Sequence, residues 1–387
     1  MRPIPRLLTI PRLLTNGLAN ANVLADAGSS QNPRVLRRLL GPALRGLLFQ
    51  RGKDSDATQM DARHDACFTW TYGHDSAGMR SLLVAARRGQ WDPDVDLDWS
   101  LPVDPFDPRR PFVDERVSPL QEVPGFAALD PATQRLHQRD LLAWSLSQFL
   151  HGEQGALYVA CQLVEAVSWT DAKLYGSTQV VDEGRHVEVF DRYLTTKLEK
   201  RYPVNDNLYV MLDALMTDRR WDLKFLGMQV IIEGLALGAF GTLRAYTHEP
   251  LLRELLRRVI TDEARHVHFG VIALQRTYAD LPDNERHERE DWAYEMCVLL
   301  RNRFLAHEFY EEHWAHRMGR RSWNRVMLES RYMARFRDTM FRRIIPNLKR
   351  IGLLSDRVRP RYARLGLLVW EHERAAPDLT TEEIVDA

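Results

Sequence analysis

The sequence has few cysteines and no excess of charge of either sign. Only three of its 387 residues are cysteine, Cys67, Cys161 and Cys297, and they lie far apart. A disulfide framework or an iron–sulfur cluster needs more cysteines or closer spacing. Both are therefore excluded, and a reducing, cytoplasmic compartment is expected. Basic and acidic residues number 53 each, so no net charge favours nucleic acid as a partner.

Long apolar runs and alternating patterns are also scarce. No apolar stretch reaches the ~20 residues needed to span a bilayer. The first residues, MRPIPRLLTIPRLL, are interrupted by arginine and proline and make a poor secretory signal. We therefore expect no transmembrane segment. No alternation of apolar and polar residues persists as strands require, so the fold is predicted to be all-α.

Two short motifs of the same kind are the main feature of the chain. They read Asp-Glu-Gly-Arg-His at 182–186 and Asp-Glu-Ala-Arg-His at 262–266. In each, Glu-x-x-His places a carboxylate and an imidazole one turn apart on one helical face, where both can bind the same cation. A lone glutamate, Glu153 or Glu233, precedes each motif by the same interval. The shift that carries Glu153 onto Glu233 therefore also superposes the two motifs.

The spacing also predicts the topology. If glutamates of consecutive antiparallel helices face each other, the turns lie midway, near Ser168 and near His248. Thr170 or Asp171 could cap the helix after the first turn. Glu249, at the second turn, is expected to be dispensable for the site. The longer interval between positions 183 and 233 leaves room for a crossover. The helices are expected at about 131–169, 171–201, 220–246 and 250–279, with a crossover helix at 205–218.

Two hairpins, two lone glutamates and two Glu-x-x-His motifs describe a four-helix di-iron carboxylate bundle. The region of roughly 135–280 resembles the ferritin-like di-iron carboxylate superfamily. Its doubled motif is similar to that of di-iron oxygenases, most closely the hydroxylase subunits of bacterial multicomponent monooxygenases, with the N-oxygenases in the same group. The resemblance implies no catalytic residue beyond the metal ligands. It implies one iron on Glu153, Glu183 and His186 and another on Glu233, Glu263 and His266, with glutamates bridging the two irons. It also implies a supporting layer behind the histidines, formed by Asp182, Arg185, Asp262 and Arg265.

Helix geometry assigns partners to the two aspartates. Each precedes its motif glutamate by one residue and so points about 100° around the helix from it, towards a neighbouring helix. It cannot readily accept the N–H of the histidine on its own helix. We therefore expect Asp182 to contact His266 and Asp262 to contact His186, with the motif arginines neutralising the aspartates. Such contacts fix the tautomer of a histidine ligand.

A polar core without metal is the alternative. Glu153 and Glu233 lie in apolar helical sequence, and buried carboxylates are costly unless they are paired or bound to a cation. Salt bridges to Arg185 and Arg265 would explain the charges but not the two histidines. Carboxylate and imidazole ligands suit iron, with manganese or a mixed manganese–iron pair as the alternatives, and the lack of a thiolate disfavours structural zinc.

Glycines gather around the two lone glutamates. Each glycine inside a helix costs about 1 kcal/mol relative to alanine, so the cluster needs a reason. The two explanations are space for dioxygen and substrate, and close contact between helices. The glycines concerned are Gly152, Gly155, Gly234, Gly238 and Gly241.

Three positions depart from the patterns of related families. Phe190 stands in place of the radical tyrosine of ribonucleotide reductase subunits. Val259 stands in place of an additional histidine ligand of p-aminobenzoate N-oxygenases. Leu237 replaces the threonine that assists dioxygen activation in multicomponent monooxygenases, which argues against their detailed mechanism. His151 and His268 lie off the ligand face of their helices and are interpreted as surface or supporting groups.

The preferred hypothesis is a di-iron oxygenase that activates dioxygen to oxidise a C–H, N–H or aldehyde group of a small organic substrate. No flavin, nicotinamide or iron–sulfur motif is visible, so a separate ferredoxin or reductase is expected to supply electrons. The alternative is a ferroxidase or another iron-handling ferritin-like protein. The long segments before position 130 and after position 280 favour a covered pocket over a minimal cage. The sequence is compatible with a homodimer but does not determine the oligomeric state.

The flanks are expected to build on the bundle. Residues 34–49 alternate leucine and arginine and predict a helix, interrupted at Gly41-Pro42, that either binds a membrane or partner or packs on the bundle. Two long helices are expected at about 284–318 and 322–345, then a turn at 346–352 and a mobile acidic end. The predicted parts are 1–129 (a loose tail to 32, helices and a proline-rich strap at 102–124), 130–280 (bundle), 281–353 (additional helices) and 354–387 (C-terminal tail).

Overall fold

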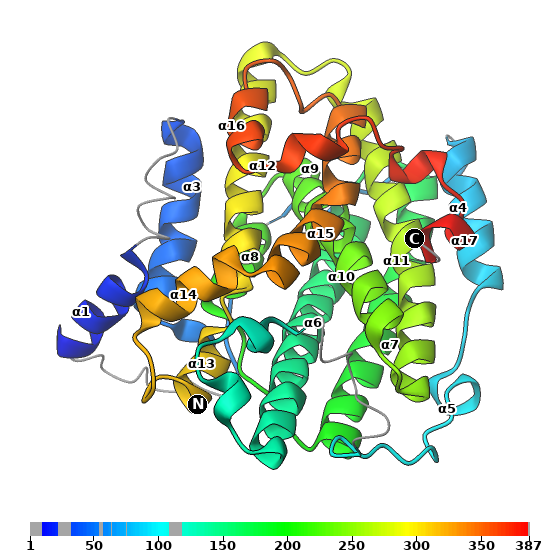
Figure 1. Cartoon of the computed structure of the whole chain (residues 1–387). Helices are drawn as coiled ribbons and strands as arrows, with labels where there is room; N and C mark the ends of the chain where they lie inside the picture. Colours follow the sequence, from blue (N-terminus) through cyan, green and yellow to red (C-terminus); the bar gives the residue numbers. More distant parts are fainter. Residues whose placement is uncertain are drawn as a thin grey trace.

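A computed structural model gives the fold and describes residues 10–21, 32–53, 57–62, 64–74, 76–107 and 118–385. Over these residues the chain is helical and contains no strand, which confirms the predicted all-α class. Four long helices form the middle of the molecule, and further helices before and after them pack around it (Figure 1).

The bundle helices lie close to their predicted bounds. The crossover between the two hairpins is α8, Asp206–Thr217. The third helix is continuous through three segments of different geometry, of which the middle one is π-helical. The bundle comprises α6 (Pro131–Ala166), α7 (Thr170–Tyr193) with the π-helical turn η6 (Leu194–Leu198), the third helix made of α9 (Trp221–Phe225), η7 (Leu226–Ile232) and α10 (Glu233–Tyr246), and α11 (Pro250–Tyr278).

Both hairpin turns lie where the glutamate spacing predicts them, between α6 and α7 and between α10 and α11. Asp130 accepts hydrogen bonds from backbone N–H groups in the first turn of α6, and Glu249 does the same for α11. A proline follows each of these caps, as helix starts favour. The predicted cap of α7 is wrong, because Trp169 occupies that position and makes no side-chain cap.

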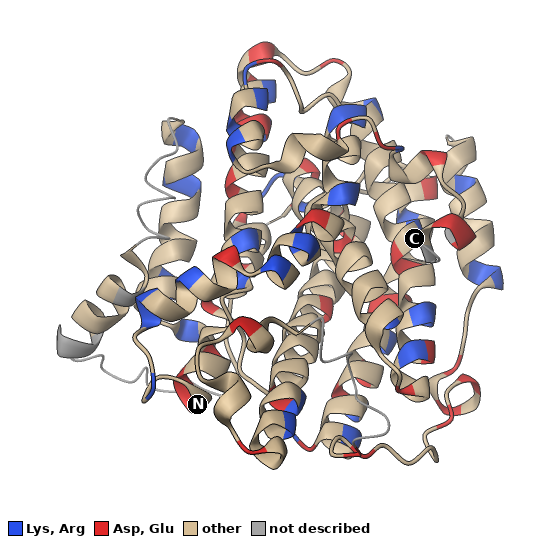
Figure 2. Cartoon of the chain, in the orientation of Figure 1, with Lys and Arg blue, Asp and Glu red and all other residues tan. Residues whose placement is uncertain are grey.

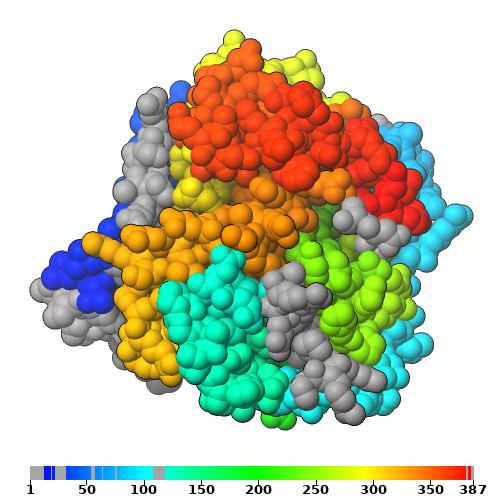
Figure 3. Space-filling model, viewed as in Figure 1, coloured from blue at the N-terminus to red at the C-terminus, as the bar shows by residue number. Residues whose placement is uncertain are grey.

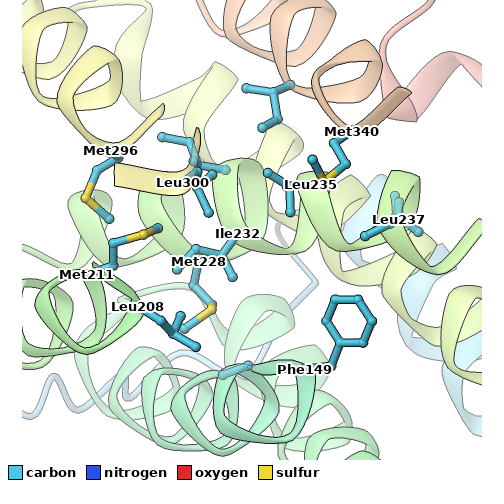
Figure 4. Packing of buried hydrophobic residues seen from close by; sticks show 14 of the residues in the cluster. Phe149, Leu208, Met211, Met228, Ile232, Leu235, Leu237, Met296, Leu300 and Met340 are labelled. Atoms are coloured by element: carbon cyan, nitrogen blue, oxygen red, sulfur yellow. The ribbon is translucent and has the colours of Figure 1, made fainter. Parts of the chain in front are cut away.

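The third helix has its predicted bounds, but it is more apolar than the expectation of no membrane-length apolar stretch. By length and composition, Trp221–Tyr246 could cross a membrane, but 94% of its most apolar window is buried among the described residues. Figure 4 shows the reason: Met228, Ile232 and Leu235 of this helix lie between Phe149 of α6 and Leu300 of a later helix. The apolar sequence therefore serves as the core helix of the bundle.

The N-terminal segments differ from the predicted tail and broken helix. Residues Ile10–Ala19 form α1, which the predicted loose tail did not include. Helix α3, Pro33–Ala43, runs through Pro42 and continues as the π-helical turn η1, Leu44–Leu48. Its Arg38 pairs with Asp218 and Glu288 at 3.1 Å. These contacts support packing on the bundle rather than a free membrane-binding face.

Between α3 and the bundle, the chain passes from the edge of the molecule where α3 lies to the opposite edge, where α4 and α5 lie (Figure 1). Helix α4 lies against both α7 and α11 and brings the loop that follows it close to the centre of the bundle. Part of the predicted proline-rich strap, 108–117, lies outside the described residues. The segments are η2 (Arg51–Lys53), α4 (Ala77–Arg88), α5 (Pro93–Asp96), η4 (Pro119–Glu122) and η5 (Phe126–Ala128).

The two long helices predicted after the bundle are each divided. The first breaks after Arg303, where Ala306 takes a left-handed conformation. The second breaks at Ser330, and its last part continues through Pro346 to Arg350, so the predicted turn at 346–352 is wrong over most of its length. The observed helices are α12 (Asp283–Arg303), α13 (His307–His313), α14 (Arg320–Glu329) and α15 (Arg331–Arg350).

The C-terminal segment is packed rather than loose as far as Ile384. Its last helix lies against α11, and Ile384 is buried. Glu371 pairs with Arg359. The predicted mobile acidic end is therefore wrong for these residues. The segment contains α16 (Arg359–Arg364), η8 (Leu367–Trp370), η9 (Ala376–Asp378) and α17 (Thr381–Val385).

Candidate metal centre

The structure brings all six glutamates and histidines of the duplicated pattern together inside the bundle. Each is at most 6% exposed. They form two sets. Within each set, the possible ligand atoms lie within 4.8 Å of one another, and Glu183 belongs to both sets. The sets are Glu153, Glu183, His186 and Glu263, and Glu183, Glu233 and His266.

Both histidines face the carboxylates through Nδ1. His186 Nδ1 lies 3.2 Å from Glu153, 3.5 Å from Glu183 and 3.2 Å from Glu263. His266 Nδ1 lies 3.1 Å from Glu183 and 3.7 Å from Glu263. The two motif glutamates therefore lie between the histidines, where bridging ligands of a dinuclear site would be.

Several atoms of this cluster have no hydrogen-bond partner among the described residues. They include Oε2 of Glu183, Oε2 of Glu233 and both carboxylate oxygens of Glu263. Four carboxylates in so small a buried volume need compensating cations. Two divalent ions would offset them, and oxygen and imidazole donors suit iron or manganese. The residues present thus fit a dinuclear metal site.

Electrostatics in the cluster divides the glutamates into two kinds. Burial, with repulsion from Glu263, raises the pKa of Glu153 and of Glu233 well above the usual range. Burial also opposes ionisation of Glu183, but contacts with His266 and His186 outweigh it and lower its pKa. The ionised forms of Glu153 and Glu233 are thus the least stable in the set. A bound cation would stabilise these two carboxylates most.

The crossed contacts predicted for the aspartates are present. His186 Nε2 lies 3.1 Å from Asp262 Oδ2, and His266 Nε2 lies 3.3 Å from Asp182 Oδ2. Arg185 donates to Asp262 at 3.0 Å and also to Asp182. An ionised carboxylate only accepts, so each histidine presents Nε2–H to its aspartate and keeps Nδ1 free for a metal.

Two residues from outside the bundle complete this layer, and neither was predicted from the sequence. Trp91 Nε1 donates to Asp262 Oδ2 at 2.8 Å, and Gln90 Nε2 donates to Asp182 Oδ1 at 3.0 Å. The Trp91 ring also lies 4.6 Å from the Arg185 guanidinium. No local pattern connects the loop after α4 with motifs so distant in the sequence.

Gln179 is a third missed residue. It is fully buried one turn before Glu183 and donates to Glu183 at 3.2 Å and to Glu233 at 3.0 Å. It therefore holds the carboxylates of Glu183 on α7 and Glu233 on α10 at a fixed separation. Its position one helical turn before Glu183 places it on the same face, which is the signal that could have found it.

The π-helix η7 ends directly before Glu233. π-Helical segments inside α-helices occur often at functional sites. The apolar sequence of this segment contains no proline or other local mark of the change in geometry, so the π-helix could not be predicted from it.

A cavity of about 20 Å³ lies beside the cluster, which is enough for one water molecule. Its polar wall includes Glu153, Glu233 and Glu263, and its apolar wall includes Phe149, Met228, Ile232 and Phe240. Arg303 also lines it. This arginine is 3% exposed, and its Nε has no hydrogen-bond partner among the described residues. Burial lowers the pKa of Arg303 to about 10, although Glu153 lies near.

The glycines around the lone glutamates have different surroundings. Gly152 lines the small cavity, and a Cβ there would meet nothing within 4 Å. At Gly238 a Cβ would lie 2.7 Å from the Met340 Cα, and at Gly155 it would collide with Leu212. Both explanations therefore apply, with space at Gly152 and close contact at the other two.

The three departures from related families lie in apolar surroundings. Phe190 packs against Phe149 and Phe240 at ring distances of 6.2 and 5.7 Å. Val259 is fully buried. Leu237 faces away from the small cavity and lines a larger one. His151 and His268 belong to neither set, and His151 Nε2 contacts the Tyr202 carbonyl at 2.9 Å.

Comparison with known proteins adds one finding. A family model described as p-aminobenzoate N-oxygenase AurF matches residues 74–352. The matched range contains both sets of glutamates and histidines, the Gln90–Trp91 loop and Arg303. A search of curated proteins finds no match.

Proposed function

The chain belongs to the p-aminobenzoate N-oxygenase family, whose members are di-iron monooxygenases acting on small molecules, and from this we propose that it oxygenates the nitrogen of a small organic amine. The family match favours oxidation of a substrate over the ferroxidase alternative. The observation that carries the proposal is the buried pair of glutamate–histidine sets with unsatisfied carboxylate oxygens.

Six residues are proposed to hold two iron ions. Glu153 and His186 would bind one ion and Glu233 and His266 the other, with Glu183 and Glu263 between them. When bound, the two irons would supply the electrons and the binding site with which dioxygen, the proposed co-substrate, is activated. Gln179 holds carboxylates of both ions, and the crossed aspartates orient the histidines. No other side chain is assigned a chemical step.

The walls of the small cavity select the substrate. Because the cavity holds about 20 Å³, an amine enters only when an apolar wall residue moves. Met228 is suited to this role, since its side chain is flexible. Once the proposed metal ions offset the carboxylates in its wall, Arg303 repels an ammonium group, so a neutral amine is favoured. Aromatic amines are neutral at pH 7, which makes them the substrates to test first.

Electrons are proposed to come from a separate protein, a ferredoxin or a reductase, because the sequence contains no motif for a redox cofactor other than the metal site. We also propose a cytoplasmic location. Its support is that Cys67, Cys161 and Cys297 form no disulfide with one another, as expected of a protein from a reducing compartment.

Metal analysis tests the proposed centre. Protein reconstituted with Fe(II) without oxygen should hold about two iron ions per chain. Glu153→Ala and Glu233→Ala should each lower this number and abolish oxygen consumption. Glu188→Ala is the matched control, because Glu188 is an exposed glutamate on α7. One zinc ion per chain, or equal metal loss in all three variants, would overturn the assignment.

Glu249, expected from its position at a turn to be dispensable, is not a suitable control. It is 8% exposed, caps α11 and accepts a hydrogen bond from the Tyr193 hydroxyl at 2.8 Å. Its replacement would destabilise the helix start by about 1 kcal/mol or more, whatever happens at the metal site.

Product analysis tests the reaction. Reduced, iron-loaded protein exposed to oxygen with an aromatic amine should yield the N-hydroxy or nitro product by mass spectrometry, with oxygen from ¹⁸O₂. Ring hydroxylation without N-oxidation would retain the oxygenase and reject the proposed site of attack. Iron oxidation with no organic product from a panel of amines would support the ferroxidase alternative.

A further inference from the structure

A second, larger cavity lies on the opposite face of α10. It has a volume of about 660 Å³, within the range of small-molecule sites. Leu237, Gly241 and Thr242 of α10 line it, whereas Glu233 and Phe240 of the same helix face the small cavity. Its other wall is α15, which packs against α10 and appears with it on the face shown in Figure 3.

The wall formed by α15 is strongly basic. The helix sequence RYMARFRDTMFRRIIPNLKR contains seven basic residues and one acidic residue, although the whole chain has no net charge. Blue segments along α15 mark this concentration in Figure 2. Four of its arginines line the cavity, and the one carboxylate among the lining residues, Glu122, accepts the backbone N–H of Arg331 at 2.8 Å. The four are Arg331, Arg335, Arg342 and Arg343.

Arg343 distinguishes the cavity from an ordinary basic surface. It is 6% exposed, and it makes no hydrogen bond or ion pair with any described residue, although it lines the cavity. Its neighbour Arg342, by contrast, pairs with Glu373 at 3.3 Å and lies over the Trp370 ring. Burial, followed by repulsion from Arg342, lowers the pKa of Arg343, although the carboxylates of Glu373 and Glu383 oppose this shift from a distance. A buried cation without a direct partner is costly, and an anion in the cavity would supply that partner.

The rest of the lining is apolar and aromatic. Tyr332 and Phe336 are stacked with ring centres 5.8 Å apart, and Leu237, Tyr246 and Ile384 complete this side. A simple inorganic anion would satisfy the arginines but leave this surface uncovered. The combination suits a molecule with a charged head and an apolar body.

We propose that this cavity binds an organic anion, with a phosphate or carboxylate head on Arg343 and an apolar or aromatic body on Leu237, Tyr332 and Phe336. Arginine binds both heads through two parallel hydrogen bonds. The site lies on the other face of α10 from the metal centre. The inference therefore does not rest on the proposed function.

Calorimetric titration of the full chain tests this site with four probes: inorganic phosphate, phenyl phosphate, benzoate and benzyl alcohol. Phenyl phosphate or benzoate should bind one per chain and at least tenfold more tightly than inorganic phosphate or benzyl alcohol. The tighter of the two identifies the head group. Arg343→Met should weaken that binding at least tenfold. Arg303→Met is the matched control, since it removes the buried arginine of the other cavity, and it should leave the binding unchanged.

A second variant keeps the test decisive if Arg343→Met fails to fold. A Cβ at Gly241 would meet nothing within 4 Å, so Gly241→Leu places a side chain in the cavity without displacing the backbone. It should block the organic anion and leave the unfolding temperature near that of the parent. Unchanged binding in Gly241→Leu, loss of binding in Arg303→Met alone, or equal binding of benzyl alcohol would overturn the proposal.

Discussion

Asp262→Asn tests whether the crossed contacts support metal binding. Three donors meet at one oxygen of Asp262: His186 at 3.1 Å, Trp91 at 2.8 Å and Arg185 at 3.0 Å. Asparagine keeps the shape and one acceptor oxygen but removes the negative charge. The imidazole of His186 then faces a neutral, weaker acceptor, which fixes its tautomer less firmly and makes it a weaker ligand.

The expected loss in metal affinity is about 10- to 100-fold, the usual scale for such partners, which corresponds to about 1.4 to 2.8 kcal/mol. We expect Asp262→Asn near the upper end of this range. Asp182→Asn should have the smaller effect, because its contact with His266 is longer, at 3.3 Å, and Gln90 donates to its other oxygen.

Two measurements check this prediction. Anaerobic titration with Zn(II) gives the affinity, and urea unfolding of the metal-free variants separates metal binding from folding. Nitrogen NMR of ¹⁵N-histidine-labelled, zinc-loaded protein identifies the ring affected. Asp262→Asn should shift the resonances of His186, and Asp182→Asn those of His266, with assignment by histidine-to-glutamine variants.

The crossed arrangement predicts which ring moves, and this makes it refutable. If Asp262→Asn shifted His266 and left His186 unchanged, each aspartate would serve its own helix. Affinities within twofold of the parent in both variants would show that the contacts do not support the metal.

Two further predictions concern stability. Gly270→Ala should lower the free energy of unfolding by about 1–3 kcal/mol, because the new Cβ would lie 2.5 Å from the Gln229 Cβ. Gly184→Ala should raise the free energy of unfolding by about 0.5–1 kcal/mol, because a Cβ there would meet nothing within 4 Å. Denaturant titration measures both changes. Burial, with the nearby Arg320 cation, lowers the pKa of His307 from 6.5 to about 4. As pH drops from 6.5 to 4, the unfolded chain therefore takes up the proton first, and the free energy of unfolding should fall by up to about 3 kcal/mol. If His307→Gln lost as much stability over this pH range as the parent, the prediction would be wrong.

The metal cluster could be predicted because helical periodicity alone determines it. Glu183 and His186 share a face because they are one turn apart, and the interval repeated in both halves puts Glu153 opposite Glu183 across a hairpin. The direction of each Cβ then placed Asp182 beside His266. These relations depend on geometry within a helix and on short turns, which sequence spacing encodes.

The remaining features depend on tertiary contacts that no local pattern records. Trp91 reaches Asp262 only because α4 packs across α7 and α11. Arg303 looks like any arginine in a helix until the fold brings it to Glu153. Pro42 was expected to interrupt its helix, but α3 continues through it, followed by a π-helical turn and anchored by Arg45, which pairs with Asp213 at 2.6 Å.

The π-helix η7 adds one residue to the third helix between Lys224 and Glu233, compared with an α-helix. The reason is that each π-helical hydrogen bond spans five residues instead of four. Before it, Lys224 donates to Gln162 at 2.6 Å and to the Leu215 carbonyl at 2.7 Å. After it, Glu233 faces the other carboxylates. Deleting one residue from 226–232 would restore α-helical bonding and turn one of these side chains by about 100°. The segment should therefore accept apolar substitutions but not a change in its number of residues.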